Sequence, residues 1–85
     1  MVFRVSFEAN EVYQMNLVKA ESSKEAERIK KESRPSCEII MAKPASMDDY
    51  RPDVPLLEKT GNGIRHVSCW TYESFHEMLR KEGNL

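Results

Sequence analysis

Cysteine, glycine and long apolar runs are all scarce in this sequence. Its 85 residues include two cysteines and three glycines, and so few cysteines exclude the disulfide framework of a small secreted domain. There is no run of about 18 apolar residues that could form a transmembrane helix. We therefore expect Cys37 and Cys69 to be free thiols that pack in the protein, and we expect no membrane partner.

An excess of charge of one sign is also missing. The chain has 13 basic and 14 acidic residues, which leaves a net charge of −1. This balance removes the simplest argument for nucleic-acid binding, a strongly basic domain, and also weakens the case for an acidic DNA mimic. The start, Met1 to Arg4, lacks the basic and apolar regions of a signal peptide, which predicts a cytoplasmic location.

The order of the sequence patterns predicts a single α+β domain over residues 1–85. We expect a three-stranded antiparallel or mixed sheet of β-β-α-β order over 1–42, and a proline-rich connection over 43–55. A short hairpin and a C-terminal helix follow over 56–85. A chain of this size buries only about 60% of its unfolded surface, so a large catalytic cleft is not expected.

Two alternating segments predict the first hairpin. Their apolar residues alternate with polar ones and are Phe3, Val5 and Phe7, then Tyr13, Met15 and Leu17. With Ala9-Asn10-Glu11 as the turn, both apolar sets fall on one face of the sheet.

A helix and a third strand come next. Ser22 with Glu25 is typical of a capping box and predicts a helix from Ser23 to Glu32, with a thin buried stripe of Ala26, Ile29 and the stem of Lys30. The strand from Cys37 to Ala42 should cross over to pair with strand one, which gives the sheet order 2-1-3. Because it is apolar on both sides, we expect either the C-terminal helix or a second copy of the chain to cover its second face.

The second half ends in a hairpin and a helix. Leu56 to Lys59 and Ile64 to Val67 flank a glycine-rich turn. The C-terminal helix should begin after Thr71, run from Tyr72 to Glu82 and end at Gly83.

Residues for catalysis or metal binding are sparse. His66, Cys69 and His76, with Cys37 far upstream, lack the close ligand pairs of structural zinc sites. A Cys69–His pair would need an orienting group and an oxyanion hole, and neither is evident. The sequence therefore predicts no metal, no cofactor and no enzymatic activity, although a metal- or thiol-dependent enzyme stays the third alternative.

The first half resembles the small DpnD/PcfM-type proteins of phages, conjugative plasmids and restriction loci. The resemblance lies in Phe3 to Glu8, Val12 to Val18, Glu38 to Ile40 and an A-x-S-x-x-E-A junction over residues 20–26. It implies a β-β-α-β module encoded by a mobile element and working in the host-cell cytoplasm. No catalytic residues carry over from that family.

We predict a non-enzymatic protein-binding accessory module of a phage or other mobile element, for instance an inhibitor of a host defence nuclease. The alternative is a small nucleic-acid-binding accessory protein. Its candidate residues are Lys24, Arg28, Lys30, Lys31 and Arg34 on the first helix and Arg65, His66 and Trp70 nearer the end. The predicted partner-binding residues are those that the fold does not obviously need: Asp48, Asp49, Tyr50, Arg51, Arg65, His66, Trp70 and Tyr72. The competing interpretation is that Tyr50, Trp70 and Tyr72 fill the core, which we favour for Trp70 alone.

Overall fold

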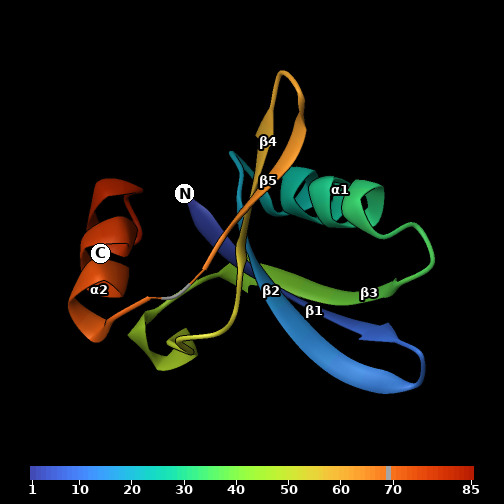
Figure 1. Ribbon diagram of the computed structural model, residues 1–85, viewed down its shortest axis with the longest axis horizontal. Helices are drawn as coiled ribbons and strands as arrows, with labels where there is room; N and C mark the ends of the chain where they lie inside the picture. The colour runs from blue at the N-terminus through green and yellow to red at the C-terminus, as the bar shows by residue number, and fades with distance from the viewer. Residues whose placement is uncertain (69) are drawn as a thin grey trace.

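The computed structural model describes residues 1–68 and 70–85. Within these residues the elements are β1 (Val2–Ala9), β2 (Val12–Lys19), α1 (Ser23–Ser33), β3 (Glu38–Pro44), the 3₁₀ helix η1 (Met47–Asp49), β4 (Leu56–Thr60), β5 (Gly63–Val67) and α2 (Tyr72–Lys81). The strands form one mixed sheet in the order β3-β1-β2-β4-β5 (Figure 1). The α+β class is confirmed.

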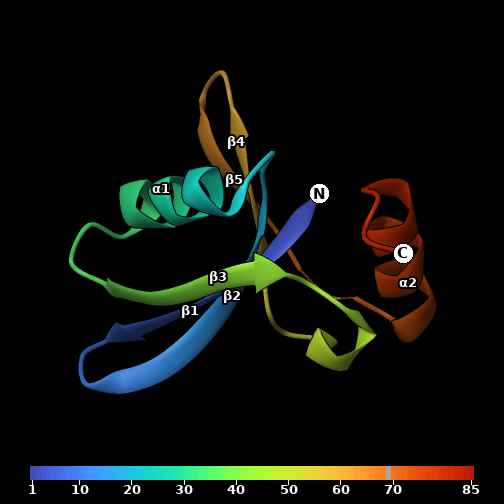
Figure 2. The ribbon, with the colours of Figure 1, turned by 180° about the vertical axis from the view of Figure 1, so that it is seen from behind.

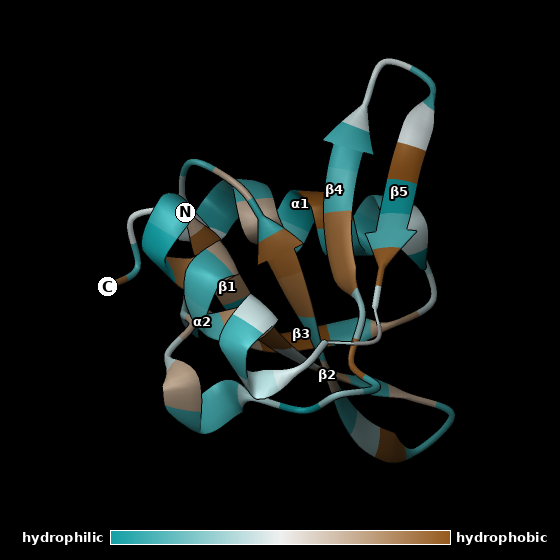
Figure 3. Ribbon diagram, turned by 60° about the vertical axis from the view of Figure 1, so that its left-hand side comes forward, coloured by the Kyte–Doolittle hydropathy of each residue, from teal (hydrophilic) through white to brown (hydrophobic). Residues whose placement is uncertain are grey.

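The predicted order 2-1-3 is present inside this larger sheet, because β1 pairs antiparallel with both β2 and β3. The C-terminal hairpin is part of the same sheet: β4 pairs parallel to β2, with Leu56 beside Leu17 and Leu57 beside Val18. Only the start of β4 is paired, because β2 ends at Lys19. Figure 3 shows that β4 is hydrophobic at its base and hydrophilic toward the hairpin tip. The third strand begins one residue later than predicted, because the backbone N–H of Cys37 donates to Arg34 O in a turn.

The register of the first hairpin differs from the prediction. The turn contains two residues, Asn10 and Glu11, both with positive φ (52° and 64°), as a type I′ turn requires. Ala9 therefore pairs with Val12, and Val5 pairs with Asn16. A shift of one residue moves a strand's side chains to the other face. The prediction that Tyr13, Met15 and Leu17 share a face with Phe3, Val5 and Phe7 is wrong.

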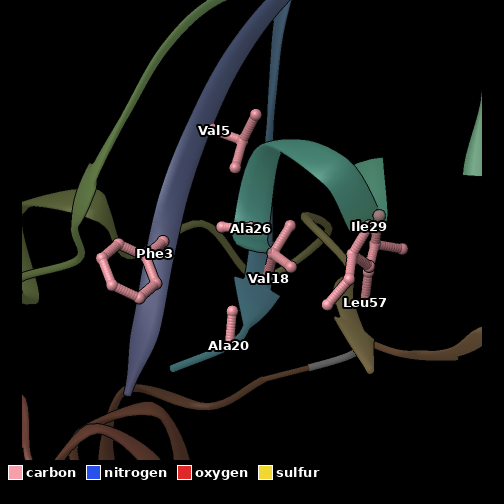
Figure 4. Packing of buried hydrophobic residues seen from close by; sticks show 7 residues of the cluster. All are labelled: Phe3, Val5, Val18, Ala20, Ala26, Ile29 and Leu57. Atoms are coloured by element: carbon pink, nitrogen blue, oxygen red, sulfur yellow. The ribbon is translucent and has the colours of Figure 1, made fainter. Parts of the chain in front are cut away.

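Helix α1 covers the face that carries Val5. Its buried residues are Ala26, Ile29 and Lys30, the predicted stripe, and Ser22 Oγ caps the helix by accepting from the backbone N–H of Glu25 at 3.1 Å. Figure 4 shows Ala26 close to Val18 and Ile29 close to Leu57 in this core. Val18 and Leu57, which the pairing of β2 with β4 places side by side, are thus also buried by α1.

Helix α2 covers one end of the opposite face. There Phe75 and Leu79 pack in one cluster with Val2, Leu17 and Leu56, and Figure 2 shows α2 on the far side of the N-terminal strand from α1. Beyond the helix, the side chain of Asn84 accepts from the backbone N–H of Val2 at 2.8 Å and donates to Val2 O and Ala45 O at 2.7 and 2.9 Å. These bonds tie the end of the chain to β1.

The second face of β3 is left open. We expected the C-terminal helix or a second copy to cover it, but α2 packs over Val2 and Leu17 instead. Ile40 and Met41 remain 51% and 49% exposed.

Candidate functional site

The uncovered part of the α2-side face of the sheet forms the candidate site. It holds a hollow of about 310 Å³ lined by Arg4 and Ser6 of β1, Tyr13, Gln14 and Met15 of β2, Ile40 of β3 and Arg51 of the connection. We call this surface, together with Met41, the open face. Tyr13 is its most exposed aromatic side chain, at 76%.

A β-bulge explains why two successive apolar residues of β3 are exposed. Ser6 pairs with Met41 and Phe7 pairs with Ile39, so Ile40 is the extra residue at the register shift. An extra residue interrupts the alternation of side chains across a sheet. Ile40 consequently lines the same hollow as Ser6, while its neighbour Met41 lies opposite Ser6.

An ion pair fixes the polar floor of the hollow. Arg4 Nη1 donates to Asp49 Oδ1 at 3.0 Å, and the backbone N–H of Ser46 donates to Asp49 Oδ2 at 2.9 Å. The side chain of Asp49 is only 5% exposed, compared with 35% for Arg4. Arg4 Nε is buried and, among the described residues, has no hydrogen-bond partner. A guanidinium has five N–H donors, so Arg4 retains donor capacity.

A second guanidinium lies on the same hollow. Arg51 Nη1 donates to Tyr50 O at 2.7 Å, and the described part of the chain places no carboxylate in an ion pair with it. Two guanidinium groups therefore line the hollow, and none of the described residues that line it carries a carboxylate. Its charge balance is positive.

Three of the sequence-predicted residues come together around Phe75. The Tyr50 ring meets those of Tyr72 and Phe75 edge-on at 5.5 Å between centroids, and Trp70 meets Phe75 at 6.3 Å. Tyr50 Oη donates to Trp70 O at 3.1 Å. Trp70 packs against the α2-side core, whereas Tyr72 is 57% exposed. Thr71 caps α2 and so positions Tyr72 at its first turn.

The other predicted residues are dispersed. Asp48 is exposed on η1 and Asp49 is buried against Arg4. Arg65 pairs with its cross-strand neighbour Glu58 at 3.2 Å. His66 lies across from Leu57, which belongs to the α1-side core, so Arg65 and His66 face opposite sides of the sheet. The eight residues are therefore not one continuous site, and their role in partner binding stays a prediction.

Sequence reasoning missed the sheet side of the open face, for which Tyr13 and Met15 were the available signal. A three-residue turn over Ala9-Asn10-Glu11 places both on the apolar face with Val5 and Phe7. A two-residue turn would have placed them opposite the polar side chains of β1.

Another hollow, of about 400 Å³, lies between α1 and β4. It is lined by Glu25, Arg28, Ile29, Glu32 and Lys59. Lys59 and Glu32 bridge it as an ion pair at 2.6 Å, and its other two charges, on Glu25 and Arg28, are of opposite sign. We do not assign a binding role to it.

Within residues 1–68 and 70–85, no three His, Cys, Asp or Glu side chains are grouped so that they could hold a metal. Cys69 lies outside these residues, as do the His66–Cys69–His76 set and the Cys37–Cys69 pair that depend on it. Across the same ranges, no helix has the length and apolar character needed to span a bilayer.

Searches of protein-family models, curated proteins and solved structures gave no match to this chain. The resemblance to DpnD/PcfM-type proteins therefore remains a prediction from the sequence.

Proposed function

We propose that this chain is a non-enzymatic protein-binding module that binds its partner through the open face. The observation that carries the proposal is the exposure of Tyr13, Ile40 and Met41 on a rigid sheet, next to Arg4 and Arg51. Tyrosine, methionine and arginine are the residue types enriched at protein interfaces. A tyrosine buries a large area at a low entropy cost, and arginines set the orientation of a partner.

The charge of the hollow favours a partner segment with a carboxylate side chain beside an apolar one. Asp49 is already engaged by Arg4 and Ser46, which leaves Arg51 and the remaining donors of Arg4 for an incoming acceptor. A guanidinium binds a carboxylate through paired N–H donors. Met15 and Ile40 then provide apolar contact for the neighbouring side chain.

Nucleic-acid binding is the less favoured function. Three of its basic candidates are engaged within the chain. Arg65 pairs with Glu58, Lys30 is buried, and Lys31 Nζ donates to Cys37 O. Phosphate contacts need cations that are free to displace counterions. The apolar wall of the open face suits a protein segment better than a sugar–phosphate backbone.

The biological setting also belongs to this proposal. The resemblance of the first half supports an accessory protein of a phage or other mobile element, with inhibition of a host defence nuclease as its task. The open face would serve that task by occupying a surface on the larger protein.

Capture from host extract with two matched variants tests the proposal. Ile40→Ser alters the open face, whereas Val12→Ser alters a similarly exposed apolar residue (54%) that pairs with Ala9. Ala9 packs with Phe7 on the α1 side, so Val12 faces away from the hollow. We expect the parent and Val12→Ser to capture the same protein and Ile40→Ser to lose about tenfold or more in affinity.

Two results would contradict the proposal. One is equal capture by Ile40→Ser when circular dichroism shows that it is folded. The other is salt-sensitive binding of DNA or RNA without any protein partner, which would support the nucleic-acid alternative.

A further inference from the structure

Strand β3 is an edge of the sheet, since β1 is its one neighbour in the described strand order. The outer side of an edge strand presents backbone N–H and C=O groups that can pair with another strand. Its residues Glu38 to Lys43 carry one charge of each sign at the two ends and apolar residues between them.

The pairing of β3 with β1 sets like charges opposite each other. Glu38 lies across from Glu8, and Lys43 lies across from Arg4. Like charges directly opposite in a sheet are destabilising. Asp49 neutralises Arg4, but within the described residues Glu8, Glu38 and Lys43 take part in no ion pair.

We propose that two copies of the chain pair antiparallel through β3, about a two-fold axis that passes between Ile40 and Met41. In this register Glu38 lies opposite Lys43 of the second copy, and Lys43 lies opposite its Glu38. Ile39 lies opposite Ala42, and Ile40 lies opposite Met41. The strand is thus complementary to itself in charge and in apolar character, as a two-fold symmetric interface requires.

Two features that usually protect an edge, a proline and a bulge, are present on β3. Pro44, which has no N–H to donate, lies just beyond the paired segment. The bulge at Ile40 lies at the axis and locally disrupts the ladder there, so backbone pairing between the copies falls on Glu38–Ile39 and Ala42–Lys43 on either side of it. Ile40 and Met41 of each copy, about half exposed in one chain, meet as an apolar group at the centre.

The opposite edge offers no such match. In the equivalent self-pairing of β5, which runs from Gly63 to Val67, Arg65 would face Arg65 of the second copy. That contact is repulsive. The sheet therefore has one self-complementary edge, and pairing there continues the sheet in its own plane. The contact uses Ile40 and Met41 of the open face, whereas Tyr13 and Met15 of β2 and Arg51 of the connection lie outside it.

Charge reversal separates dimerisation from folding. Glu38→Lys and Lys43→Glu each create like-charge pairs across the proposed axis, so either variant should raise the dimer dissociation constant about tenfold or more. Within one chain the same changes put opposite charges across from Glu8 and Arg4, so neither variant should lower the melting temperature.

Light scattering across a concentration series is the test. We expect a dimer for the parent, monomers for both single variants, and dimers again for Glu38→Lys/Lys43→Glu and for an equimolar mixture of the two single variants. A parent that is monomeric at its highest soluble concentration would overturn the proposal. So would single variants that dimerise as the parent does. Partner binding by the open face is tested separately with Tyr13→Ser, because Tyr13 lies on β2, outside the proposed contact between the two β3 strands.

Discussion

Removing the cation from the Arg4–Asp49 pair should destabilise the fold more than removing both charges. In Arg4→Met the carboxylate of Asp49, 5% exposed, loses the cation that the described residues place against it and cannot be hydrated in return. Loss of one partner of a buried pair costs about 3–5 kcal/mol. Arg4 is 35% exposed, and solvent screening therefore lowers our expectation to about 2–3 kcal/mol.

The double variant Arg4→Met/Asp49→Asn removes the stranded charge and keeps an amide oxygen for the Ser46 N–H. We expect it to recover about 1 kcal/mol relative to Arg4→Met. Urea unfolding at pH 7, followed through Trp70 fluorescence and circular dichroism, gives both free energies if the m-values agree. If Arg4→Met is no less stable than the double variant, the reasoning is refuted, because the buried charge of Asp49 then costs the fold nothing without Arg4.

Three further predictions concern the framework. Burial lowers the pKa of Lys30 below its usual 10.5. Between the pKa of Lys30 in the folded state and 10.5, the unfolded state binds more protons, so the stability of the fold rises with pH. A pH series of melting temperatures should show this rise for the parent and a flatter one for Lys30→Met. Asn84→Ala removes three hydrogen bonds to Val2 and Ala45 and should lower the free energy of unfolding by about 2 kcal/mol in urea. A 1–45 fragment leaves Val2 and Leu17 without the cover of α2 and β4 and should show no cooperative unfolding; a stable folded monomer would contradict the packing described.

Local signals predicted much of the fold. The Ser22 cap and the apolar spacing of Ala26 and Ile29 gave α1 and its buried face. The β-β-α-β order gave the pairing of β3 with β1, because a crossover through a helix leaves few alternatives. The glycine-rich turn after Thr60 gave the hairpin of β4 and β5, although nothing local indicated that β4 would pair with β2.

The missed features depend on single residues in unusual conformations. Glu11 adopts a positive φ, a conformation that costs an ordinary L-residue energy, so sequence alone favoured a longer turn there. The extra residue at Ile40 has no local signal, because Cys37 to Ala42 is apolar at both parities. Together these two features create the open face. The aromatic group around Phe75 was anticipated in part, since helical spacing places Tyr72 and Phe75 on one side of α2.

The most direct test of the proposed function compares two tyrosines in binding to the isolated partner. Tyr13 belongs to the open face, and Tyr72, also exposed, belongs to the aromatic group around Phe75. By titration calorimetry we expect Tyr13→Ser to weaken binding about tenfold or more, or about 1.4 kcal/mol, and Tyr72→Ser to bind nearly as the parent does. Full affinity of a folded Tyr13→Ser, with loss of binding by Tyr72→Ser, would contradict the account and place the interface on α2.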